Sequence, residues 1–139
     1  MRQTFRLALG VAAGLALVAS AGCSAGAANA AAPLTVEVGI HFSKFLPGSL
    51  EVPAGRSIRF VLHNDDFIDH EFIVGDDALQ ARHEAGGESR HNSRPTEVEV
   101  PAGATVSTLV TFARAARLTY ACHAPGHFAY GMSGQLTVR

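Results

Sequence analysis

Apolar and polar side chains alternate with a period of two residues through much of the chain after its N-terminal segment. Val36, Val38, Ile40 and Phe42 share one parity, and residues 58–62 repeat the pattern. This period is typical of strands that bury one face, whereas an amphipathic helix would repeat about every three to four residues. We therefore expect an all-β protein.

Proline and glycine turns divide the sequence into short strands. Besides the two stretches above, the expected strands are residues 51–52, 70–74, 96–100, 105–112, 118–122 and 135–138. Seven or eight short strands of this kind predict a β-sandwich. The motif EVPAG occurs at residues 51–55 and again at residues 99–103, each time where one expected strand ends. We interpret it as the same turn used twice.

One segment departs from the alternation. Residues 76–94 are polar and charged, and the stretch DDALQARHEA predicts a short helix before a loop that contains glycine. We expect an insertion on the surface of the sandwich. Its histidines, His83 and His91, have two interpretations: solvated loop residues, which are the more common case, or ligands of a second metal ion.

The first 30 residues predict a secretory signal peptide. Arg2 and Arg6 form a basic start, and residues 7–19 are an apolar run too short to span a bilayer comfortably. Two cleavage sites fit, the lipoprotein-type ASAGC that ends at Cys23 and the ordinary ANA at residues 28–30; an uncleaved anchor is the weaker alternative. We expect an exported protein, periplasmic or extracellular, free or tethered through a lipid on Cys23, with one folded domain at residues 31–139.

Charge and motifs exclude several classes of function. The chain has 11 Lys and Arg and 12 Asp and Glu, and two of the basic residues belong to the signal, so the folded domain is mildly acidic. This charge balance gives no indication that the protein binds nucleic acid or contacts a membrane through a polybasic surface. The sequence also lacks a GxSxG elbow, an HExxH helix and a phosphate-binding glycine loop, so we expect no enzyme activity. We also expect a monomer.

Cys122 is the only cysteine of the expected domain, so no internal disulfide can form. An unpaired thiol in an exported protein is exposed to oxidation unless the protein buries it or uses it. A buried, inert cysteine is one interpretation. The surrounding stretch YACHAPGHFAYGM favours a second one, because His127 and then Met132 follow Cys122 at intervals of five residues.

A loop between two strands can bring Cys122, His127 and Met132 to one point, because its proline and glycines permit tight turns. A fourth ligand must come from elsewhere, and His70 is the best candidate because it follows a polar turn and opens an apolar strand. Structural zinc rarely takes a thioether, whereas two imidazoles, a thiolate and a weak axial Met suit copper. We expect one type 1 copper per chain at these four residues.

These motifs resemble those of the cupredoxins, the family of plastocyanin, azurin and rusticyanin. The resemblance covers residues 34–139 and rests on FLPGSLEVPAGRSIRFVLHN, HEF and YACHAPGHFAYGMSGQLTV. It implies a Greek-key β-sandwich, with His70, Cys122 and His127 as equatorial ligands of a blue copper ion and Met132 as its axial ligand. It also implies electron transfer as the function.

One departure from this family is His123, which follows the cysteine as in multicopper oxidases. Its strand parity is opposite to that of Cys122, so we expect a solvent-exposed side chain; an electron exit or a secondary copper contact is the alternative. His41 and His63 lie on the outward parity, and we assign them no ligand role.

Two functions stay open at this stage. The first, which we favour because a Met-capped site in a rigid loop suits reversible redox cycling, is an electron carrier that docks a cytochrome or copper enzyme at an apolar rim near His127, Phe128 and Tyr130. The second is copper buffering, delivery or resistance through the same site, which the seven histidines of the chain favour. A metal-free interaction module is a third interpretation, which the complete set of ligands disfavours.

Overall fold

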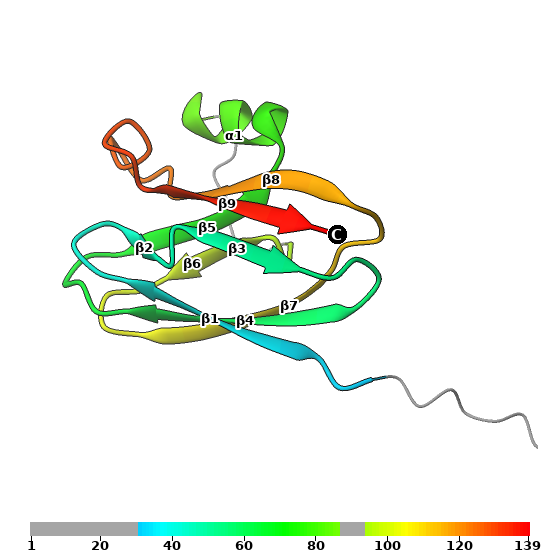
Figure 1. Cartoon of the computed structure of the whole chain (residues 1–139). Helices are drawn as coiled ribbons and strands as arrows, with labels where there is room; N and C mark the ends of the chain where they lie inside the picture. The colour runs from blue at the N-terminus through cyan, green and yellow to red at the C-terminus, as the bar shows by residue number, and fades with distance from the viewer. Residues whose placement is uncertain (1–30, 87–93) are drawn as a thin grey trace, which may run out of the picture.

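The computed structural model describes residues 31–86 and 94–139, so the expected signal peptide, Cys23 and His91 lie outside the described residues. In the described part of the chain, nine strands form two sheets that pack face to face, and one short helix lies beside them (Figure 1). Within these residues we find no helix with the length and apolar character needed to cross a membrane.

The two sheets are both mixed. The first contains β1 (Leu34–Ile40), β2 (Phe45–Leu46), β4 (Ser57–Asn64) and β7 (Thr105–Thr111), in the order β2-β1-β4-β7. The second contains β3 (Ser49–Val52), β5 (His70–Gly75), β6 (Glu97–Val100), β8 (Ala116–Ala121) and β9 (Ser133–Val138), in the order β3-β9-β8-β5-β6. The pairs β1–β4 and β3–β9 are parallel, and the other pairs are antiparallel.

The core lies between the two sheets. Ile58, Phe60 and Leu62 alternate along β4 and are fully buried, as the period of two predicts. The ring of Phe72, from the opposite sheet, lies 5.4 Å from that of Phe60 and 5.5 Å from that of Tyr120. Each such side chain contributes about 1.5–3 kcal/mol when it leaves water. This core fixes the ends of the strands from which the loops emerge.

The predicted all-β sandwich is confirmed. Residues 31–86 and 94–139 contain nine strands where the sequence indicated seven or eight, because β2 is only two residues long and shows no alternation. The two EVPAG turns are also alike: Gly55 and Gly103 both adopt a left-handed backbone, with φ of 74° and 66°. Glycine takes this conformation without the steric cost of a side chain.

The predicted short helix is α1 (Asp77–Glu84). The carboxylate of Asp76 caps it by accepting a hydrogen bond from the backbone N–H of Leu79 at 2.9 Å. The side-chain amide of Gln80 donates to the carbonyls of Ile73 in β5 and Thr119 in β8, so the helix is anchored on the second sheet. The insertion is therefore a packed element of the fold.

The more common interpretation of His83, a solvated residue, is wrong. Its side chain is buried, and its ring stacks on that of His123 with centroids 5.6 Å apart. Its Nε2 lies 3.8 Å from Oε1 of Glu97, which is itself fully buried and forms an ion pair with Arg94. The face that α1 buries is thus polar. The sequence of α1 therefore lacks the apolar stripe that usually marks the buried face of a helix.

Candidate metal centre

Three loops meet at one end of the sandwich, on the left in Figure 1: residues 41–44, residues 65–69 and residues 122–132. Their contacts join segments that are distant in the sequence. The ammonium group of Lys44 donates to the carbonyls of Tyr130 at 2.7 Å and Gly131 at 3.1 Å. The backbone N–H of Phe42 donates to Oδ1 of Asp66 at 2.7 Å. All the predicted ligands lie at this end.

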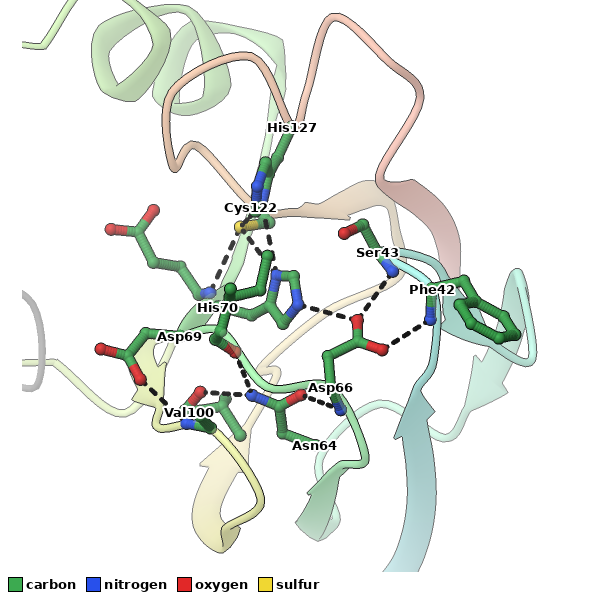
Figure 2. A network of polar contacts seen from close by, with 12 residues as sticks. Phe42, Ser43, Asn64, Asp66, Asp69, His70, Val100, Cys122 and His127 are labelled. Atoms are coloured by element: carbon green, nitrogen blue, oxygen red, sulfur yellow. Dashed lines mark hydrogen bonds and ion pairs between the residues drawn. The ribbon is translucent and has the colours of Figure 1, made fainter.

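The strand side of the site, which we define as residues 64–70, holds one ligand. His70 is the first residue of β5, pairs with Val100 of β6 and is 1% exposed. Its Nε2 lies 3.0 Å from Oδ2 of Asp66, and its Nδ1 faces Cys122 and His127 (Figure 2). The strand therefore fixes the backbone of His70, and the carboxylate of Asp66 fixes the Nε2 edge of its imidazole.

The loop side, residues 122–132, holds the other predicted ligands. The N–H of Cys122 donates to the carbonyl of Met132 at 3.2 Å, and the N–H of Met132 donates to that of His127 at 2.9 Å. Gly126 and Gly131 adopt left-handed conformations, with φ of 83° and 82°. These hydrogen bonds and glycines fold the loop back on itself, so residues five positions apart become neighbours.

Three donor atoms converge between the two sides. Nδ1 of His70 and Nδ1 of His127 are 3.2 Å apart, and Sγ of Cys122 lies 3.9 Å from the first and 3.3 Å from the second. Metal–nitrogen and metal–sulfur bonds of about 2.0–2.3 Å place the ligands of one ion roughly 3–4 Å apart. The three residues fit one metal ion, and within residues 31–86 and 94–139 they form the one such group of His, Cys, Asp or Glu donors.

Burial shifts the pKa values of Cys122 and His127, the two donors on the loop side. It raises the pKa of the Cys122 thiol; the N–H groups of Glu71 and Ala124 oppose this shift, and the charge of Glu71 adds to it. Burial also lowers the pKa of His127, as does His70, while the carboxylates of Glu71 and Asp66 oppose the shift. Without metal, the site thus favours a thiol and a neutral imidazole, and metal binding would require loss of the thiol proton.

Met132 is buried, with 1% of its surface exposed, and belongs to the hydrophobic core. Its backbone bonds to Cys122 and His127 place it in the same turn as these ligands. Its role as the axial ligand stays a prediction.

The sequence reasoning missed Asp66 and Asn64. The Asp66 carboxylate accepts hydrogen bonds from the N–H groups of Phe42 and Ser43 as well as from His70. Burial would raise the pKa of Asp66, but the Ser43, Phe42 and His70 contacts outweigh burial and lower it. The polar run HNDDFIDH just before the strand was the available signal. It did not show which carboxylate faces the histidine.

The expectation that His123 is exposed is wrong. Its side chain is 2% exposed, with Nδ1 2.9 Å from Oε2 of Glu84 and Nε2 2.7 Å from Oε1 of Gln80. The ring of Phe128 lies 4.8 Å away on the loop side. Helix α1 therefore covers the residue that follows Cys122, and the parity of a single strand does not reveal such a cover.

His127 is the ligand nearest to the surface. It borders a hollow that is also lined by Phe42, Ser43, Lys44, Pro125 and Tyr130. Tyr130 is 83% exposed, whereas Phe128 is half-buried against His123. Of the two aromatic residues expected at a docking rim, Tyr130 is the one that projects from the protein.

Residues 32–139 match the family model for copper binding proteins of the plastocyanin/azurin family. The chain belongs to this family, which confirms the cupredoxin prediction, and copper is the metal of the site. The chain is 33% identical to the copper-resistant cuproprotein CopI of Pseudomonas aeruginosa, over 79% of this chain and 78% of that protein. It is 36% identical to the copper-resistant cuproprotein CopI of Rubrivivax gelatinosus, over 69% of this chain and 60% of that protein.

Solved structures support the same fold. Auracyanin B superposes with a TM-score of 0.66 at 24% identity, over 76% of this chain and 88% of that chain. Auracyanin A, a blue copper protein of Chloroflexus aurantiacus, superposes with a TM-score of 0.62 at 26% identity, over 78% of this chain and 100% of that chain.

Proposed function

We propose that this chain is an exported, monomeric copper protein that contributes to copper resistance by holding one copper ion per chain. The observation that carries the proposal is the convergence of Nδ1 of His70, Nδ1 of His127 and Sγ of Cys122. The names of the two CopI relatives support the resistance function. The basic start and apolar run of the first 30 residues support export, with Cys23 as a lipid anchor where the lipoprotein-type site is used.

Bound copper supplies one-electron chemistry between Cu(II) and Cu(I). The protein supplies the geometry: β5 fixes His70, the folded loop fixes Cys122 and His127, and the surrounding core keeps water from the thiolate. Met132 would be the fourth and weakest donor of the proposed ligand set. No substrate bond is made or broken in this role, so we propose a binding protein rather than an enzyme.

Cys122→Ser tests the resistance function, with Ser107→Ala on the exposed face of β7 as the control. We expect the wild type and the control to bind one equivalent of copper and to restore growth of a copper-sensitive strain in copper-rich medium. Cys122→Ser should fail in both assays. Full tolerance from a Cys122→Ser protein that no longer binds copper would contradict the proposal.

The second candidate function, electron transfer, is favoured by one observation. The ligand His127 borders a surface hollow, and the exposed ring of Tyr130 lies on the same rim. Such an edge suits brief docking of a cytochrome or a copper enzyme. His127, Phe128 and Tyr130 would form this docking area.

Tyr130→Glu tests the electron-transfer function. It is preferred to a substitution of Phe128, because Phe128 packs on His123 and its loss would also change the structure of the loop. A charge at Tyr130 should slow stopped-flow electron exchange with a cytochrome and leave copper affinity and colour unchanged. Leu109→Glu is the control. Leu109 is 46% exposed on β7 of the first sheet, whereas the loop that carries Tyr130 joins β8 and β9 of the second sheet. Equal exchange rates in both variants and the wild type would count against a carrier that docks at this rim.

A further inference from the structure

A buried asparagine fixes the loop that precedes His70. The side-chain NH2 of Asn64 donates to the carbonyl of Val100 at 2.9 Å (Figure 2). Its two hydrogens are shared with the carbonyls of Ile68 at 2.9 Å and Pro101 at 3.1 Å. Oδ1 of Asn64 accepts from the backbone N–H of Asp66 at 3.0 Å. One side chain thus bonds both ends of the connection between β4 and β5, and it sets the position of the Asp66 backbone.

The carboxylate of Asp66 lies in a nest of backbone N–H groups. Phe42 donates to Oδ1 at 2.7 Å and Ser43 donates to Oδ2 at 2.8 Å. Both donors adopt left-handed conformations, with φ of 50° and 53°, which residues other than glycine rarely do. Successive N–H groups in such a turn form a concavity for an anion. The conformation of the 41–44 loop is therefore suited to holding this carboxylate.

The third partner of the carboxylate is the ligand His70. Oδ2 of Asp66 lies 3.0 Å from its Nε2, and the side chains are 12% and 0% exposed. The ionised carboxylate of Asp66 can only accept hydrogen bonds, so in this contact the imidazole is the donor, and its proton lies on Nε2. The lone pair of the neutral ring then lies on Nδ1, the atom that faces Cys122 and His127.

We propose that Asp66 is the positioning residue of the copper centre: its carboxylate holds His70 in the Nδ1-donor tautomer and favours Cu(II) over Cu(I). This inference rests on the proposed copper site. A carboxylate that accepts from a ligand imidazole fixes the ring and increases its strength as a donor. Its negative charge also stabilises the more highly charged oxidation state.

Asp66→Asn tests the proposal against Asp65→Asn. The control removes the same charge from an exposed neighbour whose backbone N–H bonds to Ile40, and no contact joins its carboxylate to the site. Copper affinity is measured by competition titration, and the reduction potential by redox titration. Far-UV circular dichroism and chemical denaturation establish that each variant folds.

We expect Asp66→Asn to weaken Cu(II) binding by about 10–100-fold, as is typical when an outer-shell partner is lost. Cu(I) binding should fall less, and each tenfold fall in the ratio of the Cu(II) to the Cu(I) affinity raises the potential by about 59 mV. Asp65→Asn should change both quantities much less. Equal changes in the two variants would overturn the proposal.

A measurement on the wild type keeps the test independent of how the variants fold. Long-range proton–nitrogen NMR of the metal-free protein identifies which ring nitrogen of His70 carries the proton. We expect a proton on Nε2; a proton on Nδ1 would overturn the proposal. If the wild type shows the tautomer but no copper–thiolate colour, the proposed copper site fails rather than the role of Asp66 in orienting His70.

Discussion

The two imidazoles of the site offer the same atom, Nδ1, but the protein holds them in different ways. His70 is buried at the start of a strand, and a carboxylate in its own nest of hydrogen bonds fixes its far edge. His127 lies on a loop that is held by backbone hydrogen bonds and left-handed glycines, beside a surface hollow. From this difference we expect the strand side to set the copper affinity and the reduction potential, and the loop side to set access to the site.

The largest expected effect is that of His70→Ala. It removes a ligand and leaves the Asp66 carboxylate without its imidazole partner. Copper binding should weaken by more than the roughly 10–100-fold typical of losing an outer-shell partner. Competition titration measures this, with His63→Ala as the control, because His63 lies on β4 and contacts Glu37 and Thr105. Similar affinities of the two variants would show that His70 is not a ligand.

Asn64→Ala removes the side chain that bonds the strand side together. Three carbonyls lose a donor and the N–H of Asp66 loses its acceptor. Only the hydrogen bond to Val100 is fully buried, and an unsatisfied buried group costs about 1–3 kcal/mol, so we expect the free energy of unfolding to fall by about 3 kcal/mol. Chemical denaturation of the metal-free protein measures this, with exposed Gln135→Ala as the control. A loss below that of the control would contradict the assigned role of Asn64.

Gly126→Ala is the corresponding change on the loop side. The residue has φ of +83°, and a new Cβ would lie 3.1 Å from the ring of Tyr130. A left-handed backbone costs a residue with a side chain about 1–2 kcal/mol, so the stability loss should be smaller than for Asn64→Ala. The control is Gly48→Ala, where a Cβ meets nothing within 4 Å. Equal stability of both glycine variants would show that the loop does not need this conformation.

Among substitutions of the proposed ligands, Met132→Leu should change copper binding least. The substitution nearly conserves volume in the core, so it should cost less than about 1.5 kcal/mol of stability. An axial thioether is a weak, long contact, so the protein should stay coloured while the reduction potential rises. Spectroscopy and redox titration measure both. A copper loss as large as that of His70→Ala would make Met132 a principal ligand.

The parts of the molecule that follow from short-range sequence pattern were predictable. The period of two gave the strands, and the spacing of Cys122, His127 and Met132 gave one loop with three potential ligands. His70 was found from its position after a polar turn, and the structure places it beside Cys122 and His127. The metal ligation itself, and the axial role of Met132, stay predictions.

The parts that depend on contacts between distant segments were not predictable. The carboxylate of Asp66 is held by two backbone N–H groups about 24 residues away, whose direction depends on an unusual turn. His83 and His123 become buried because α1 packs a polar face, with Gln80, on the second sheet. Neither the composition nor the periodicity of these segments indicates such contacts, because most polar side chains lie on the solvated surface.

The visible absorption and EPR spectra of the purified protein with Cu(II), recorded beside those of Cys122→Ser, test the central claim most directly. Cys122 is fully buried, and its Sγ lies 3.3 Å from Nδ1 of His127 and 3.9 Å from Nδ1 of His70. We predict an intense thiolate-to-copper charge-transfer band that is absent from the variant. A colourless Cu(II) complex of the wild type, or a band that persists in Cys122→Ser, would contradict the assignment of this copper site.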